Sequence, residues 1–392
     1  MRGRRRFLKA FGGAALAASG EGGGAVGGMR LFLTGDVMTG RGIDQVLAHP
    51  SRPRIHEGYM TSALGYVELA EQAHGPIPRR VGFDHVWGDA LAELEARAPD
   101  LRIVNLETSI TTSEEAAPKG INYRMHPANV PCLRAAGIDC CVLANNHVLD
   151  WGSRGLLETL DSLHGAGIAT TGAGRSAEEA ERPAVLRAGG TRVLVFGFGS
   201  PTSGIPPDWA ATPRRPGVRV LPDLSPASAK EVAAQVRGWR QTGDRVVASL
   251  HWGGNWGYEV PLEHRAFAHR LVDEAGVDVV HGHSSHHPKG IEVYGGRLVL
   301  YGCGDFLNDY EGIAGYEEYR SELVLAYFVT LDSASGELVG LEMVPYRIRR
   351  FRLERAERGD AEWLRRTLDR EGRALGTKVE LAASGALALG RR

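Results

Sequence analysis

A short apolar run typical of a buried β-strand leads directly into four histidines in the stretch Asp278-Val279-Val280-His281-Gly282-His283-Ser284-Ser285-His286-His287-Pro288. Packing explains this density poorly, because histidine is a poor core residue and neighbouring histidines repel one another when protonated. Metal ligation by two or three of the rings explains it better, with the others near the ligands or facing a substrate. The stretch therefore predicts a strand that ends at a metal site.

Apolar runs that end in polar residues recur along the chain. They cover residues 31–33, 101–105, 138–143, 193–198, 246–250 and 277–280. Segments of helix length, with apolar residues at helical spacing, lie between most of these runs, at residues 87–98, 130–136, 155–164, 225–240 and 263–275. This alternation predicts a layered α/β fold with a central sheet flanked by helices.

Two further strand pairs follow one another without an intervening helix, at residues 290–294 with 298–301 and 323–331 with 338–347. They predict mixed sheets, closed by a C-terminal helix near residues 361–373. The proline-rich residues 200–226 predict a long loop or cap. Beyond Arg373 the chain is rich in alanine and glycine, and we expect it to fray.

The overall composition is that of a soluble globular protein, with 24% charged and 43% hydrophobic residues. Because 46 basic and 47 acidic residues nearly cancel, the net charge of -1 predicts no general attraction for nucleic acid or anionic membranes. The four cysteines are too few and too irregularly spaced for a disulfide scaffold or a CxxC zinc site, so we interpret them as core thiols.

The N-terminus resembles a twin-arginine export signal, because Arg4-Arg5-Arg6-Phe7-Leu8-Lys9 precedes a weakly apolar run too short to span a membrane. It predicts an exported or cell-envelope protein. The alternative, a basic tail on a cytoplasmic protein, has a similar sequence. We expect three parts: the signal with a glycine-rich linker over residues 1–28, one α/β domain over 29–350, and a C-terminal helix and tail over 351–392.

Single chemistry-bearing residues also follow the predicted strands. Asp36 ends the first strand, Glu107 follows the second, and His251 lies just past another. Taken singly, Asp36 could cap a helix and Glu107 could lie on the surface. Open α/β sheets form their binding crevice at the carboxyl ends of the strands, however, so we expect these residues to converge.

The segment from Asn145 to Asp150 is less ordinary, since two amides, an imidazole and a carboxylate follow one apolar strand. The amide oxygen of Asn145 or Asn146 can bind a hard or borderline metal, and His147 can move a proton while Asp150 holds its ring. The alternative is a turn with a helix cap.

These motifs together resemble a known family. The series Gly35-Asp36-Val37-Met38, Asn105-Leu106-Glu107, Ala144-Asn145-Asn146-His147 with Asp150-Trp151-Gly152, His251-Trp252-Gly253 and Gly282-His283-x-x-His286 is similar to the CapA (PgsA) capsule-synthesis family. The resemblance runs in the same order from about Arg30 to about Asn308. Members of this family are associated with the making or export of poly-γ-glutamate and belong to the calcineurin-like metallophosphoesterase superfamily.

The resemblance implies a metallophosphoesterase-like sandwich with central mixed sheets and one or two divalent metals, for which manganese, iron and zinc are all acceptable. It implies that Asp36 binds one metal and that Glu107 bridges two. The second metal would be held by Asn146, His251 and His283, and the first also by His286. His147 would be the general acid and Asp150 its orienting partner. Arg41 and Asn145 are expected to contact the substrate, although Arg41 could equally be a solvated helix residue.

Three residues depart from the family pattern. Met38 stands where the superfamily has a histidine, and a thioether is a poor ligand for hard divalent ions, so one metal site is expected to be weak or empty. Asp305 stands where this family more often has asparagine, which adds a carboxylate near the site. Asn255 stands near a common glutamate position, which predicts altered substrate contacts.

Three functions fit this sequence. The first is phosphoester hydrolysis, in which metal-activated water attacks phosphorus and His147 protonates the leaving oxygen. The second is metal-dependent binding or handling of an acidic polymer without turnover, and Met38 is its best support. The third is metal-dependent cleavage or transfer at an amide bond. Expected partners are an acidic polymer or a phosphorylated substrate and other capsule-synthesis proteins.

Overall fold

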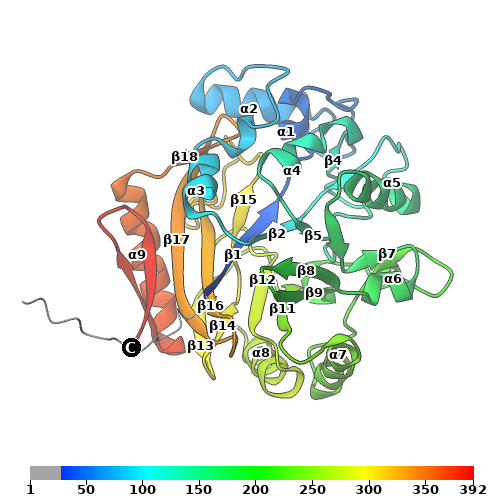
Figure 1. Cartoon of the computed structure of the whole chain (residues 1–392). Helices are drawn as coiled ribbons and strands as arrows, with labels where there is room; N and C mark the ends of the chain where they lie inside the picture. Colours follow the sequence, from blue (N-terminus) through cyan, green and yellow to red (C-terminus); the bar gives the residue numbers. More distant parts are fainter. Residues whose placement is uncertain (1–27) are drawn as a thin grey trace, which may run out of the picture.

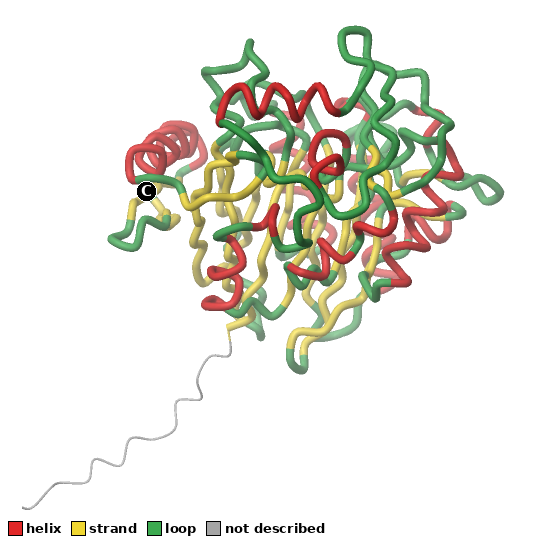
Figure 2. The backbone as a smooth tube through the Cα atoms, turned by 90° about the horizontal axis from the view of Figure 1, so that it is seen from above, coloured by secondary structure: helices red, strands yellow, loops and turns green. Residues whose placement is uncertain are grey.

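The computed structural model describes residues 28–392 and contains two packed β-sheets with helices on their outer faces (Figures 1 and 2). The predicted twin-arginine signal and nearly all of the linker lie outside the described residues. Viewed from above, the strands fill the centre and the helices lie around them (Figure 2).

The larger sheet has ten strands in the order β19-β20-β17-β16-β1-β2-β5-β6, with β15 paired to β1 and β18 to β17. Strands β1, β2, β5 and β6 are parallel, whereas β16 and β17 are antiparallel to their neighbours, so the sheet is mixed. Its strands are β1 (Gly28–Val37), β2 (Leu101–Leu106), β5 (Cys140–Val142), β6 (Ala169–Thr171), β15 (Asp305–Leu307), β16 (Leu323–Asp332), β17 (Leu338–Arg349), β18 (Arg352–Arg355), β19 (Thr377–Leu381) and β20 (Leu387–Arg391).

The smaller sheet has six strands in the order β13-β14-β12-β11-β9-β8. Four neighbours, β9, β11, β12 and β14, are parallel, and the edge strands β8 and β13 are antiparallel. The strands are β8 (Ala184–Ala188), β9 (Thr191–Gly199), β11 (Arg245–His251), β12 (Val279–His283), β13 (Ile291–Tyr294) and β14 (Arg297–Leu300). The pairs β3 (Ser109–Ile110) with β4 (Arg124–Met125) and β7 (Ala173–Gly174) with β10 (Gly217–Val218) form two small sheets.

Helices cover both sheets, with α7 and α8 beside the smaller sheet and α9 beside β17 (Figure 1). They are α1 (Arg41–Val46), α2 (Leu64–His74), α3 (Ala90–Arg97), α4 (Pro131–Ala135), α5 (Gly152–Gly165), α6 (Ala177–Glu181), α7 (Pro226–Trp239), α8 (Leu262–Ala275) and α9 (Arg358–Gly372). Within residues 28–392, none of the helices is both long enough and apolar enough to cross a membrane.

The alternation of side chains between the two faces of each strand explains why the sheets pack on each other and on the helices. In β9, Val193 and Val195 belong to the core shared with the larger sheet, whereas Leu194, Phe196 and Phe198 pack with α7 and α8. Successive side chains point to opposite faces of a strand, so a continuous apolar run buries both faces. The predicted fold class, a layered α/β protein with central mixed sheets flanked by helices, is confirmed.

Local signals fix where the helices begin and end. Helix α7 begins after Ser225, whose side chain accepts a hydrogen bond from the Ser228 backbone N–H, and Pro226 occupies the first turn. Helix α8 ends at Gly276, which has a left-handed backbone with φ 66°. Both helices match the predicted segments at residues 225–240 and 263–275.

The expectation that the chain frays beyond Arg373 is wrong. Residues beyond it form β19 and β20, and β20 pairs with β17 at the edge of the larger sheet. Val379 and Leu387 are buried there, and the Thr377 hydroxyl donates to the Ile291 carbonyl at 2.6 Å. Within this alanine-rich segment, apolar residues alternate over a short stretch. Such a stretch can form a strand when the edge of a sheet lies nearby to pair with it.

Two smaller predictions are confirmed. Residues 200–226 form a long connection with only the short helices η3 (Pro201–Ser203) and η4 (Pro207–Trp209) and the two-residue strand β10. All four cysteines lie in the described part of the chain and are buried free thiols.

Candidate metal centre

The chemistry-bearing residues converge because strand register brings them together. Along the parallel pair β11 and β12, His251 lies opposite His283, and in the larger sheet Asp36 of β1 lies opposite Asn105 of β2 and Asp305 of β15. The carboxyl ends of these strands meet between the two sheets, as predicted from the polar residues that follow each apolar run.

A close approach of two glycines sets the position of Asp36. A side chain at Gly35 would place its Cβ only 1.6 Å from the Gly304 carbonyl oxygen, so no other residue fits there without moving the backbone. The Asp36 N–H donates to that same carbonyl at 3.0 Å. The contact holds β1 against the chain leading into β15 and so places Asp36 beside Asp305.

One potential ligand group contains Asp36, His286 and Asp305, all buried, with ligand atoms within 4.8 Å of one another. The His286 Nδ1 lies 2.8 Å from Asp305 Oδ1. The sequence predicted Asp36 and His286 together at the first metal and placed Asp305 only near the site. The structure brings all three together.

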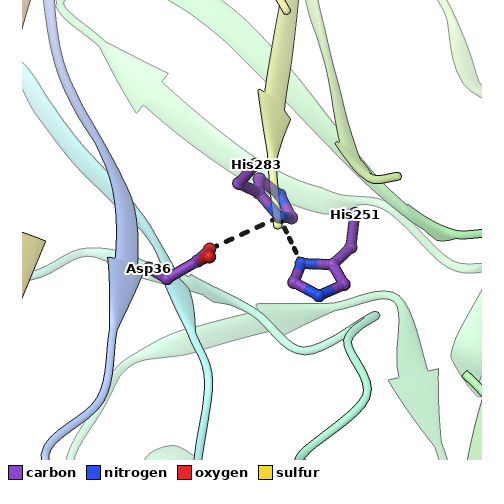
Figure 3. Close-up of side chains that lie close together, drawn as sticks. All are labelled: Asp36, His251 and His283. Atoms are coloured by element: carbon purple, nitrogen blue, oxygen red, sulfur yellow. Dashed lines mark hydrogen bonds and ion pairs between the residues drawn. The ribbon is translucent and has the colours of Figure 1, made fainter. Parts of the chain in front are cut away.

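The second group contains Asp36, His251 and His283, drawn in Figure 3. His283 Nδ1 lies 2.8 Å from His251 Nδ1 and 3.8 Å from Asp36 Oδ1. The other nitrogen of His283 lies 2.8 Å from the Ser249 hydroxyl, which orients the ring so that Nδ1 faces Asp36. Asp36 therefore belongs to both groups.

Two residues that follow strands of the larger sheet, Glu107 after β2 and Asn146 after β5, also belong to this cluster. His251 Nε2 lies 2.9 Å from Asn146 Oδ1 and 3.6 Å from Glu107 Oε1. The second carboxylate oxygen of Glu107 is buried and finds no hydrogen-bond partner among the described residues. A buried carboxylate oxygen without a partner is costly unless a cation binds it.

The electrostatics also fit a divalent cation. Burial and the charge of Asp305 raise the pKa of Asp36 to about 7, and burial together with the charge of Asp36 raises the pKa of Glu107 well above its usual value. Burial lowers the pKa values of His251 and His283 well below 6.5, so both rings are neutral and able to bind metal. Neutral imidazoles with carboxylate and amide oxygens suit manganese, iron or zinc.

Met38 lies beside this cluster and is fully buried. Its sulfur lies 3.7 Å from the Tyr310 hydroxyl, which in turn lies 3.4 Å from His286 Nε2. A phenol and a thioether therefore lie next to His286, at the position where the resemblance led us to expect a histidine. Asp305 supplies a carboxylate on the other side of this ring.

His147 and Asp150 form the pair that the sequence predicted, with His147 Nδ1 2.7 Å from Asp150 Oδ2. His147 Nε2 lies 3.8 Å from Glu107 Oε1, so the ring lies between Asp150 and Glu107, one of the candidate metal ligands. Burial lowers the pKa of His147 to about 4, although Asp150 favours the charged form. The ring is therefore neutral at neutral pH.

Lys119 is a site residue that sequence reasoning missed. Its Nζ donates to Asp150 Oδ1 at 2.8 Å and to the backbone carbonyl of Asn146, and it lies 3.3 Å from His147 Nδ1. It comes from an irregular segment before Tyr123 and follows no apolar strand, so no local pattern marked it. One ammonium group thus contacts the residues predicted to bind metal, move a proton and orient the ring.

The two predicted substrate residues are buried and already bonded. Arg41 is not solvated, because its guanidinium donates to Asp309 at 2.6 and 2.8 Å and to Glu57 at 3.1 Å. The Asn145 amide accepts from the backbone N–H groups of His147 and Val148 and donates to Asn105 and Leu106. These contacts give Asn145 a structural role in the loop, and substrate contact by either residue stays a prediction.

The other two histidines of residues 278–288 have packing partners. His281 bonds to the Ser249 hydroxyl at 3.0 Å and the Thr34 carbonyl at 2.7 Å, and His287 stacks on Tyr319. Their positions agree with the prediction that only part of the histidine cluster consists of ligands.

The fold and the site together define a class: a layered α/β protein that gathers a buried carboxylate, imidazole and amide cluster, fit for divalent metal, at the ends of its strands. Residues 30–310 match the family of the bacterial capsule synthesis protein PGA_cap, and the chain belongs to this family. The CapA resemblance is thereby confirmed.

Individual relatives agree with this assignment. The chain is 50% identical over 89% of its length to a probable polyglutamine synthesis accessory protein of Mycobacterium tuberculosis, and covers 92% of that protein. It is 28% identical to the capsule biosynthesis protein CapA of Bacillus anthracis, over 66% of this chain and 62% of that one. A solved structure described as a novel phosphatase of Mycoplasma pneumoniae superposes with a TM-score of 0.44 at 12% identity, covering 85% of this chain and 96% of the other.

Proposed function

We propose that this chain is a metal-dependent phosphoester hydrolase that serves as an accessory protein in the synthesis or export of a polyglutamate capsule. The observation that carries the proposal is the buried Glu107 oxygen without a partner, set among two further carboxylates and three imidazoles. The names of the relatives, which refer to capsule or polyglutamine synthesis, support the biological role.

Asp36, His286 and Asp305 would hold one ion, and His251, His283 and Asn146 a second, with Glu107 between them. Bound divalent ions would stabilise negative charge on a phosphate group and make a water molecule a stronger acid. Because Asp36 belongs to both potential ligand groups, it would hold the residues of the two groups in position relative to each other.

His147 would move the proton. With its Nδ1 proton directed at Asp150, its Nε2 faces the ligand cluster from the side of Glu107. Burial keeps the ring neutral in the free protein, and the negative charge of a bound phosphoester would raise its pKa. The ring could then carry the proton that the leaving oxygen requires.

The test combines metal analysis with a substrate panel. Protein loaded separately with manganese, iron and zinc is assayed against phosphomonoesters and phosphodiesters, alongside His283→Ala and His286→Ala. We expect stoichiometric metal and hydrolysis in the wild type, and a loss of at least a hundredfold in the variants, on the order of a catalytic metal's contribution. Wild-type protein that binds metal fully but hydrolyses none of the esters contradicts the proposal.

Met38 favours a second candidate, a metal-dependent binding protein for an acidic polymer without turnover. Its thioether replaces a nitrogen ligand, which weakens one ion site and with it the case for catalysis. Restoring the ligand with Met38→His separates the two functions. A rise in both metal content and hydrolysis supports a weakened hydrolase, whereas unchanged inactivity with retained binding of poly-γ-glutamate supports the binding protein.

A further inference from the structure

A cavity of about 510 Å³ adjoins the candidate metal centre on the side of His286. Its lining includes Asn255 and His286, and the rings of Trp256 and Tyr310, which also line it, pack against His286. Because a cavity of about 300–1,000 Å³ accommodates a small organic molecule, this space is large enough for a substrate group next to a phosphate at the metals.

Large apolar side chains are exposed around the opening of this cavity. Tyr316 is 47%, Ile313 41% and Tyr59 70% exposed, and all three line it. Tyr316 stacks on Trp256 with ring centroids 4.1 Å apart, which holds both rings in place. Exposed apolar side chains gathered at a cavity mark a binding surface more often than an ordinary stretch of surface.

The charged side chains of the cavity argue against an anionic occupant. Each lining arginine already has a carboxylate partner, since Arg41 pairs with Asp309 and Arg347 with Asp360 at 2.7 Å. The His74 Nδ1 likewise lies 2.6 Å from Glu311. Glu322 is paired with Arg320 at 2.9 Å, whereas Glu317 has no ion-pair partner among the described residues and adds negative charge to the lining. A chain of carboxylates would therefore meet repulsion here, whereas an uncharged flat group would meet aromatic surface.

We propose that this cavity binds an uncharged aromatic group of the substrate, of aryl or nucleobase size, while the phosphate lies at the metals. The proposal depends on the proposed function for the position of the phosphate. It identifies the substrate as a small aryl-type phosphoester, and it assigns Trp256 and Tyr316 to the recognition of the group that the phosphate carries.

The test compares two non-hydrolysable probes, phenylphosphonate and methylphosphonate, by calorimetric titration of the manganese-loaded protein. We expect the wild type to bind the phenyl probe about tenfold more tightly, which is the upper range for an aromatic contact. Tyr316→Ala should lose most of this preference while its affinity for methylphosphonate stays unchanged. Trp239→Ala removes a similarly exposed aromatic on α7 and should behave as wild type.

Equal affinity of the wild type for both probes overturns the proposal, as does displacement of phenylphosphonate by γ-glutamyl oligomers. Tyr59→Ala serves as a second variant if Tyr316→Ala does not fold. Because binding is measured without turnover, a preference for the phenyl probe in a protein that hydrolyses no ester upholds this proposal while contradicting the hydrolase function. A protein that hydrolyses esters but binds both probes equally upholds the hydrolase function and contradicts the proposal for the cavity.

Discussion

At Asp150, a buried carboxylate is bonded to three groups from different parts of the chain. It accepts hydrogen bonds from the Lys119 ammonium, from the Tyr123 backbone N–H at 2.6 Å and from the His147 ring. Removing the ammonium of Lys119 would leave the buried carboxylate of Asp150 with one hydrogen-bond donor fewer. The carboxylate would then attract the Nδ1 proton of His147 more strongly. We therefore propose that Lys119 is a positioning residue for the pair of His147 and Asp150.

We predict that Lys119→Met lowers the kcat of phosphoester hydrolysis by about ten- to a hundredfold, a partial loss of the contribution of general acid–base catalysis. Metal content should stay unchanged, because the ligands are intact. Lys119→Arg should retain most of the activity, since it restores the cation. Lys378→Met, which removes a lysine paired with Glu380 on β19, is the matched control. Wild-type kcat in Lys119→Met would show that the ammonium is dispensable.

Most of the candidate ligands were predictable because each lies at the end of its own apolar strand. Asp36, His251 and His283 are of this kind. Asp305 was placed only near the site, because its contact with His286 depends on the pairing of β15 with β1, which are far apart in sequence. Lys119 had no local signal at all, since a single lysine in an irregular segment is usually a surface residue.

Among the elements, β19 and β20 show how composition can mislead. Alanine and glycine suggested fraying, but Val379, Leu381 and Leu387 alternate so that one face of the hairpin can pack on the larger sheet. The edge of β17 then supplies hydrogen-bond partners to β20. Pairing with an edge from elsewhere in the chain is long-range information that a local pattern does not contain.

Because the hairpin of β19 and β20 packs on the larger sheet, a substitution in the segment that we expected to fray should lower the stability of the fold strongly. Leu387→Ala should lower the free energy of unfolding by about 2–5 kcal/mol, the usual cost of emptying a buried leucine site. Urea denaturation followed by circular dichroism measures it. Val339→Ala, at a β17 side chain that is 62% exposed, should stay within about 0.5 kcal/mol of wild type. Similar small effects for both variants would mean that the hairpin does not pack in solution.

On the scale of the whole molecule, the candidate metal centre lies where the two sheets meet. Asp36, Glu107 and Asn146 belong to the larger sheet and the segments that follow its strands, and His251 and His283 to the smaller one. An ion bound by both sets would stabilise the packing of one sheet on the other. The stability of the whole fold is therefore expected to depend on metal.

The pH dependence of this stabilisation follows from Asp36, whose pKa in the metal-free protein is raised from 3.8 to about 7. Protonation of Asp36 stabilises the metal-free fold at low pH, and this contribution is lost as the pH rises through 7. Metal binds the ionised carboxylate, so its contribution increases over the same range. We predict that the rise in Tm on adding manganese grows between pH 5.5 and 8. A constant or shrinking difference, measured by scanning calorimetry, would argue against Asp36 as a ligand.

The first strand of the fold has a neighbour that is synthesised very late. Along β1, Gly28 lies opposite Asp332 of β16, and Asp36 lies opposite Asp305 of β15. At translation rates of about 5–20 residues per second, β1 waits for tens of seconds before these partners leave the ribosome. During that interval an apolar strand is available to chaperones and to wrong partners. A nascent chain that ends before Asp305 would lack one carboxylate of the candidate metal centre, so we expect complete metal loading to require synthesis past this strand.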